Sequence, residues 1–107
     1  MYTLIVTDPA KQDIQRSFDW WRDHRSATQA TSWYHDIFHA IGTLREHPER
    51  CGKAPENDLC PGGIRQLLFG TGRRPTHRIV FTVAVGVVTV LRVRHSSQDD
   101  LTLDDVT

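Results

Sequence analysis

The fold of this protein is decided by residues 76–95, which read THRIVFTVAVGVVTVLRVRH. Both halves of this stretch are rich in valine, isoleucine and threonine, which favour β-strands. Val85-Gly86 lies between the halves and predicts a hairpin. A further strand is expected at residues 64–69, so residues 64–95 are predicted to form three strands.

The first half of the chain predicts a strand followed by two helices. Residues 1–7 are short and rich in β-forming side chains. Apolar residues then recur every three or four positions along residues 8–47, the spacing of helices that each bury one face. Asp8 followed by Pro9 predicts a helix start with Asp8 as the N-cap, and Ser26 can cap a second helix. Two helices so close in the chain are expected to form an αα-hairpin.

The remaining segments predict a loop and an irregular tail. Residues 48–63 hold three prolines, three glycines and both cysteines, which indicates a loop. Residues 96–107 form a polar, acidic tail. Because the two helices are consecutive, we expect a single α+β domain over residues 1–107, with the helical hairpin on one face of a mostly antiparallel, twisted sheet. The other face of the sheet is expected to be free for a partner.

The composition favours a soluble cytoplasmic protein. The 107 residues carry a formal net charge of zero and include two cysteines, which are expected to be reduced thiols. The longest apolar stretch, residues 79–91, is too short to span a bilayer. His35 and His39 have the spacing of a metal-binding pair on a helix, but no third ligand is evident. We therefore assign no metal and no cofactor.

Positive charge is concentrated in one segment. Residues 64–98 contain no Asp or Glu but six arginines, namely Arg65, Arg73, Arg74, Arg78, Arg92 and Arg94. The arginine side chain is a planar fork that suits phosphate and carboxylate groups, so this segment predicts a polyanionic partner. The alternative is a solvated surface neutralised by the acidic tail, which contains Asp99, Asp100, Asp104 and Asp105.

Four stretches together resemble one family of small proteins. ERCGKAPEN (49–57), GIRQLLFG (63–70), THRIVFTV (76–83) and VLRVRHSSQD (90–99) are similar to the RelE/ParE superfamily of type II toxin–antitoxin toxins, in particular to the branch of plasmid stabilisation proteins. The resemblance implies the fold expected above, a bacterial or archaeal cytoplasmic setting, and an antitoxin that neutralises the toxin by wrapping it.

The superfamily includes two activities. RelE-like members cut messenger RNA in the ribosomal A site, whereas ParE-like members poison DNA gyrase and lack the nuclease residues. Pro55-Glu56, His77-Arg78 and Arg94-His95 resemble the nuclease pattern, and Arg65 stands where the nucleases carry a basic residue. The chain departs from that pattern after His95, where no tyrosine follows.

The resemblance implies catalytic roles for four residues. Glu56 is the expected base for the 2′-OH, Arg65 and Arg78 would hold the phosphate, and His95 would act as acid or base. RNA phosphates would bind at the arginines outside this set: Arg73, Arg74, Arg92 and Arg94. The resulting hypothesis is a ribosome-dependent, metal-independent mRNA endonuclease that arrests translation.

Two other functions stay open at this point. One is a ParE-like inhibitor of DNA gyrase without enzymatic activity, and the other is an inactive toxin that survives as an antitoxin-binding co-regulator. Each of the three predicts that an acidic, amphipathic antitoxin segment binds the free sheet face and its arginines.

The register of the hairpin decides which side chains share a face. With a two-residue turn, Ala84 pairs with Val87, Arg78 lies opposite Val93, and His95 lies on the same face as Arg78. With a three-residue loop and a bulge at Gly86, Arg78 instead lies beside Arg92 and Arg94. The sequence leaves both registers open.

Overall fold

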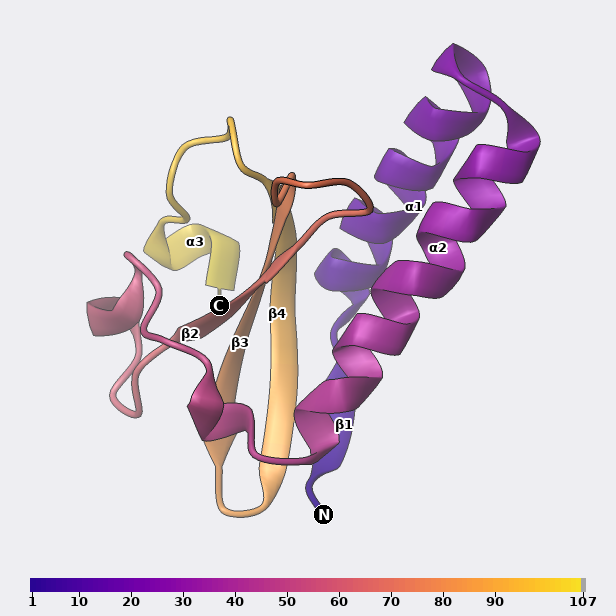
Figure 1. Cartoon of the computed structure of the whole chain (residues 1–107). Coiled ribbons are helices and arrows are strands. Elements are labelled where there is room, and N and C mark those ends of the chain that lie inside the picture. Colours follow the sequence, from indigo (N-terminus) through magenta and orange to yellow (C-terminus); the bar gives the residue numbers. More distant parts are fainter. Residues whose placement is uncertain (107) are drawn as a thin grey trace.

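The computed structural model describes residues 1–106 and has an α+β fold built on one four-stranded sheet (Figure 1). The strands are β1 (Thr3–Val6), β2 (Arg65–Phe69), β3 (His77–Ala84) and β4 (Val87–His95). Their order in the sheet is β1-β4-β3-β2, with β1 parallel to β4 and the other neighbours antiparallel. The predicted fold class and the three late strands are confirmed.

Two consecutive helices, α1 (Asp8–His24) and α2 (Ala27–Gly42), form the predicted hairpin. The Ser26 hydroxyl accepts a hydrogen bond from the backbone of α2, as predicted for a cap. The prediction for α1 was wrong by one residue, because the hydroxyl of Thr7, and not Asp8, accepts from the first turn. After Gly42 the chain forms a 3₁₀ turn (Thr43–Arg45), so the α-helix ends before residue 47, where the helical region was expected to end.

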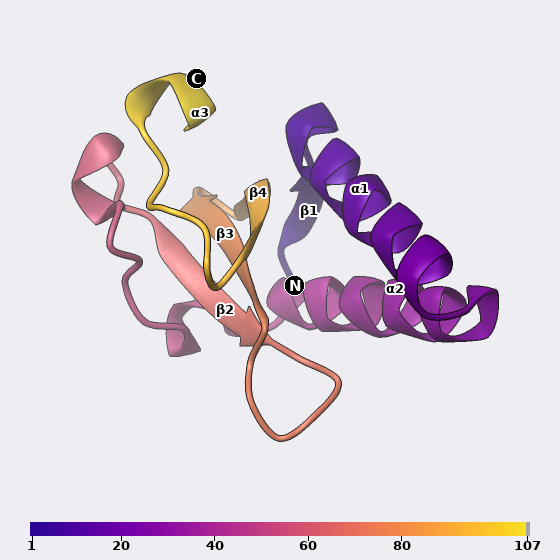
Figure 2. The same ribbon diagram turned by 90° about the horizontal axis from the view of Figure 1, so that it is seen from above.

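The helices cover one face of the sheet (Figure 2). Ile14 of α1 and Trp33, Ile37 and Ile41 of α2 are almost fully buried. They form one apolar cluster with the sheet residues Ile79, Phe81, Val88, Val90 and Val93. Burial of each such side chain contributes on the order of 1.5–3 kcal/mol, so this interface is the main source of stability.

The other face of the sheet is covered, which corrects the expectation of a free face. Leu101 of the tail is only 4% exposed and packs with Ala54, Ile64 and Val80 in a second apolar cluster. Beyond Leu101 the tail forms a short helix, α3 (Leu103–Val106), and is therefore not wholly irregular. The physical reason is that Ile64 and Val80 would otherwise leave apolar surface in water.

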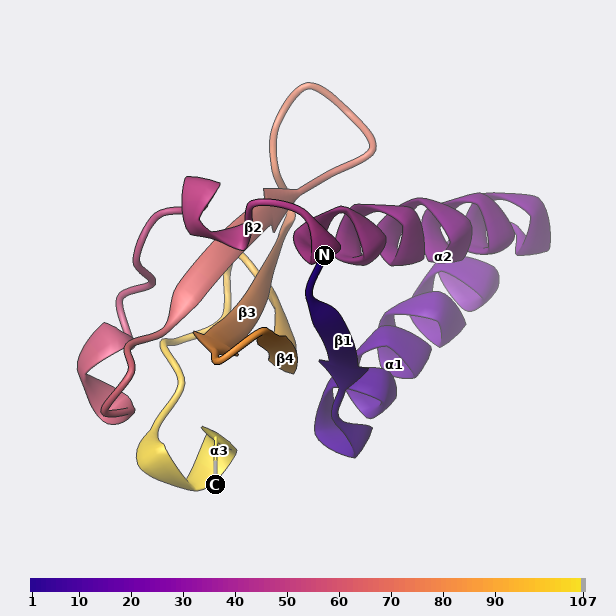
Figure 3. The ribbon, with the colours of Figure 1, turned by 90° about the horizontal axis from the view of Figure 1, so that it is seen from below.

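The loop that was predicted between the helices and the late strands contains two 3₁₀ turns, Pro48–Arg50 and Asn57–Leu59. His47 just before it adopts a left-handed conformation, with φ of 50°. This loop packs beside the tail, so the sheet lies between the helical hairpin on one side and the loop and tail on the other (Figures 2 and 3).

The β3–β4 hairpin has a two-residue turn, one of the two alternatives that the sequence left open, with Ala84 paired to Val87. Val85 and Gly86 both have positive φ, at 40° and 75°, as the favoured hairpin turn requires. Valine is strained in this conformation because its side chain is β-branched.

A β-bulge changes the register farther along the same hairpin. Phe81 pairs with Val90 and Val80 pairs with Arg92, which leaves Leu91 as an extra residue in β4. As a result Arg78 lies opposite Arg94 and His77 lies opposite His95. Of the two registers that the sequence left open, the structure therefore has the one that places Arg78 beside Arg94, and it is reached through a bulge at Leu91 and not at Gly86.

No helix within residues 1–106 is both long enough and apolar enough to cross a membrane.

Candidate functional site

The predicted catalytic residues lie on opposite faces of the sheet. Side chains alternate between the two faces along a strand, so Arg78 and Arg94 point towards the tail, and His77 and His95 point towards the helices. Glu56 and Arg78 therefore do not share a pocket with His95. The bulge at Leu91 is the physical reason, because it shifts His95 to the face opposite Arg78.

Glu56 and Arg78 form a buried ion pair. Arg78 donates from Nη1 to Glu56 Oε1 at 3.0 Å and from Nη2 to Glu56 Oε2 at 2.7 Å. The Leu101 N–H also donates to Glu56 Oε2, and Arg78 Nη1 also donates to Gln66. Glu56 is 4% exposed and Arg78 is 8% exposed. This network joins the loop, the sheet and the tail.

The pKa values of the pair reflect mutual stabilisation. Burial raises the pKa of Glu56, but the hydrogen bonds from Arg78 and Leu101 and the charge of Arg78 lower it by more, so the pKa lies below its ordinary value. The hydrogen bond to Glu56 raises the pKa of Arg78. Both groups are therefore charged at neutral pH and neutralise each other.

Arg92 is held by Asp13 of α1, a residue that the sequence analysis did not single out. Arg92 donates from Nε and Nη2 to the two carboxylate oxygens of Asp13, at 2.7 and 2.9 Å. Asp13 also accepts the Val93 N–H at 3.0 Å, in the part of β4 that extends beyond the end of β1. An acidic residue on the apolar stripe, directly before Ile14, is the signal that could have revealed this role.

The other arginines differ in how they are engaged. Arg65 donates to the backbone carbonyl of Cys51 at 2.6 Å. Arg94 donates from Nη2 to the carbonyl of Asp99, and its Nε is buried without a partner among residues 1–106. Arg73 and Arg74 are exposed in the β2–β3 loop, which projects beyond the sheet (Figures 2 and 3), and the described residues include no ion-pair partner for either.

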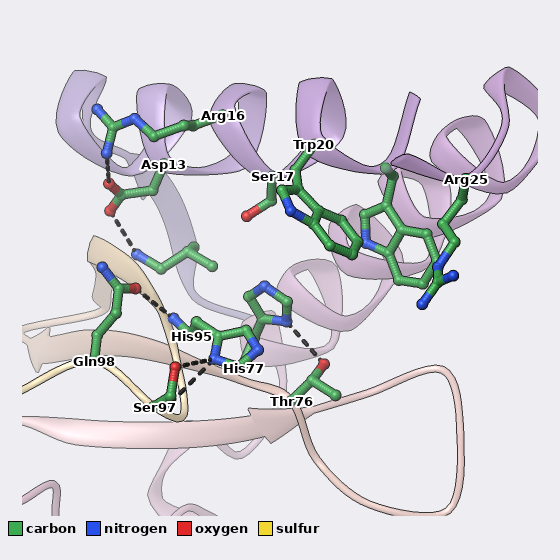
Figure 4. Close-up of a pocket in the computed structure, with 12 residues that line it drawn as sticks. Asp13, Arg16, Ser17, Trp20, Arg25, Thr76, His77, His95, Ser97 and Gln98 are labelled. Carbon is green, nitrogen blue, oxygen red and sulfur yellow. Dashed lines mark hydrogen bonds and ion pairs between the residues drawn. The ribbon is translucent and has the colours of Figure 1, made fainter. Parts of the chain in front are cut away.

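A pocket of about 540 Å³ lies between α1 and the ends of β3 and β4 (Figure 4). Ser17, Trp20 and Trp21 line it from α1, and His77 and His95 line it from the strands. The two imidazole rings have their centroids 5.2 Å apart and are nearly perpendicular. His95 is the one predicted catalytic residue that contributes to this pocket within the described chain.

His77 is neutral at physiological pH. It is 6% exposed, and burial, with the electrostatic effect of His95, lowers the pKa of His77 to about 4. Its Nδ1 lies 2.8 Å from the Thr76 hydroxyl. A group with this pKa binds a proton too weakly to serve as an acid at neutral pH, so His77 is suited to hydrogen bonding.

The polar contacts of His95 define its tautomer. The Ser97 N–H donates to His95 Nδ1 at 3.1 Å, and the Ser97 hydroxyl lies 2.8 Å from the same nitrogen. Because Nδ1 accepts a hydrogen bond, the neutral ring carries its proton on Nε2. Within residues 1–106, no three His, Cys, Asp or Glu side chains lie close enough together to hold a metal ion.

The helical hairpin packed on one face of an open four-stranded sheet is the fold of RelE/ParE superfamily toxins. The family described as the ParE toxin of the type II toxin-antitoxin system, parDE, matches residues 4–100, so the chain belongs to the ParE toxin family. A cognate antitoxin is the partner that this membership implies.

The solved structures that match the chain include one with a similar fold over most of its length. It is described as the chromosomal ParDE TA system from P. aeruginosa, and it matches with a TM-score of 0.70 and 22% sequence identity. The match covers 89% of this chain and 96% of that chain. No curated protein that was compared with the chain matches it.

Proposed function

We propose that this toxin acts by binding DNA gyrase and does not cleave RNA. The observation that carries the proposal is the buried Glu56–Arg78 pair, in which the expected base and the expected phosphate-binding cation neutralise each other. The gyrase target follows from the superfamily resemblance, in which ParE-like members poison gyrase. The site of action is then the cytoplasm.

A nuclease mechanism needs a base that reaches the 2′-OH and a cation that is free to bind the phosphate. Both oxygens of Glu56 accept hydrogen bonds from inside the protein. Arg78 is bound by Glu56 and Gln66. His95 lies on the other side of the sheet, and no tyrosine follows it. These features favour a toxin that inhibits gyrase by binding it over a toxin that cleaves RNA.

Arg73 and Arg74 are the arginines best placed for contact with a target. Both are exposed in a projecting loop, and neither has an ion-pair partner among residues 1–106. We propose that the antitoxin binds the same loop, because the sheet face that was expected to bind the antitoxin is covered by the tail. An acidic antitoxin segment would then neutralise the toxin by masking the surface that contacts gyrase.

The proposal is tested by expressing the toxin without its antitoxin. We expect growth arrest with induction of the DNA-damage response and with intact messenger RNA, mapped by primer extension. Translation-dependent cuts in the messages would instead support the endonuclease. Growth without arrest would support the inactive co-regulator.

Arg73 and Arg74 are tested by the double variant R73A/R74A, with Arg45→Ala as the control. Arg45 is also an exposed arginine, but it lies next to the start of β1, at the opposite end of the sheet. We expect the double variant to lose both toxicity and antitoxin affinity, and the control to retain both.

A further inference from the structure

The pocket between α1 and the strand ends exposes a ring nitrogen of His77 that is not hydrogen-bonded within the described chain. His77 uses Nδ1 towards Thr76, and no hydrogen bond to its Nε2 is found among residues 1–106. In Figure 4 the ring nitrogen opposite the Thr76 contact points into the pocket, towards Ser17 and Trp20. This nitrogen is therefore available to a group from outside the chain.

Other polar groups converge on the same space. His95 presents Nε2–H, because its Nδ1 accepts the Ser97 N–H. Gln98 accepts the His95 N–H through Oε1, which leaves its amide N–H groups available as donors. The pocket therefore offers several hydrogen-bond donors within a small volume, together with the free nitrogen of His77.

The charges at the pocket favour an anion. Asp13, the carboxylate of the lining, is already neutralised by Arg92 and also accepts the Val93 N–H. Arg16 and Arg25 also line the pocket. Arg16 already pairs with Asp13 at 3.7 Å, whereas Arg25 is exposed and has no ion-pair partner among residues 1–106. A largely solvated guanidinium group without a competing carboxylate, as at Arg25, suits a phosphate group.

The walls of the pocket are aromatic and held in place. The Trp20 indole is stacked on His24 with ring centroids 4.8 Å apart, and it lies perpendicular to Trp21. The Arg25 guanidinium lies 5.9 Å from the centroid of the Trp20 ring. Indole surfaces fixed in this way are suited to a flat ring, and less to a flexible acidic side chain.

We propose that this pocket binds a nucleoside 5′-phosphate unit, either as a free mononucleotide or as one nucleotide of a single strand. The base packs against the indoles of Trp20 and Trp21, with its polar edge towards His77 and His95. The phosphate lies at Arg25. The volume of about 540 Å³ is in the range of small-ligand pockets. This site is separate from the Arg73/Arg74 loop and does not depend on the gyrase proposal.

The test is isothermal titration calorimetry of the full chain with AMP, GMP, CMP and UMP. Inorganic phosphate, uncharged nucleosides, an eight-nucleotide single strand and a synthetic aspartate-rich peptide are titrated in parallel. We expect at least one mononucleotide to bind about tenfold more tightly than phosphate or its own nucleoside. Tighter binding of the single strand than of the mononucleotide would identify nucleic acid as the source, and the reverse would identify the free nucleotide.

Substitutions of pocket residues test whether the nucleotide binds in this pocket. Trp20→Ala and Arg25→Ala change exposed side chains, so the fold is expected to persist, and thermal melts check this. Each is expected to weaken nucleotide binding about tenfold through loss of aromatic or phosphate contacts. Arg45→Ala is the matched control and should bind as the wild type does.

The proposal is overturned by three results. One is no heat of binding with any nucleotide or single strand at millimolar concentration. The second is binding that Trp20→Ala and Arg25→Ala leave unchanged. The third is binding of the acidic peptide alone, which would identify the pocket as a protein-docking site.

Discussion

Glu56 and Arg78 are 22 residues apart in the chain, yet each terminal nitrogen of the Arg78 guanidinium donates to one oxygen of the Glu56 carboxylate. The pair lies beneath the tail, and the Leu101 N–H donates a hydrogen bond to one of the two Glu56 carboxylate oxygens. Two residues expected to do chemistry thus hold the loop, β3 and the tail together.

Removal of one partner of this pair is expected to be strongly destabilising. Glu56→Ala leaves the Arg78 charge buried and unpaired, which costs about 3–5 kcal/mol of unfolding free energy. The double variant E56L/R78M should lose less, because no charge is left buried. Urea denaturation of the three proteins measures this. A loss below about 1 kcal/mol for Glu56→Ala would contradict the structural role.

The stability of the protein is expected to fall in acid because of His77. Its pKa of about 4 lies below the ordinary 6.5, so the unfolded chain binds this proton more readily than the native protein. The free energy of unfolding should therefore decrease as the pH falls from about 6.5 to 4, by on the order of 3 kcal/mol. Glu56, whose pKa is also lowered, adds a further loss at lower pH.

The variant His77→Phe isolates the contribution of the histidine. It removes the titrating group, so the decrease between pH 6.5 and 4 should largely disappear in urea denaturation series measured across that range. An unchanged pH dependence in His77→Phe would show that other groups cause it.

Asp13 is expected to contribute strongly to stability, because it is buried where α1 meets β4. Asp13→Asn weakens the two-point pair with Arg92 and should cost about 2–3 kcal/mol. Asp19→Asn is the matched control on the same helix, because Asp19 pairs with Arg22 at the surface. The control should change the free energy of unfolding by less than about 0.5 kcal/mol. Equal effects of the two variants would contradict the role of Asp13.

Val85 is expected to be a site where substitution stabilises the protein. Its side chain is fully exposed and its φ is positive, a conformation that asparagine adopts more readily than valine. Val85→Asn should therefore raise the free energy of unfolding by about 1 kcal/mol. Thermal and urea denaturation measure the gain, and a loss of stability would show that the turn is not strained.

The hairpins and the helical hairpin could be predicted because their signals are local. The helical spacing of apolar residues and the Val85-Gly86 turn each depend on a few neighbouring positions. The bulge at Leu91 was missed, although a signal was present. The buried residues Val88 and Val90 are two apart, but the next one, Val93, follows after three.

The candidate sites were harder to predict because they depend on contacts between distant segments. Glu56 meets Arg78, and Asp13 meets Arg92, only after the loop and α1 have packed on the sheet. The burial of Leu101 was also missed, since the few apolar residues of the acidic tail, Leu101, Leu103 and Val106, give no clear periodic signal.

The most direct test of the central claim is a supercoiling assay with purified gyrase and purified toxin, run beside a translation reaction with the same toxin. The proposal predicts inhibition of supercoiling at micromolar toxin, loss of that inhibition in R73A/R74A but not in Arg45→Ala, and intact messenger RNA in the translation reaction. Unimpaired supercoiling together with cleaved messenger RNA would contradict it.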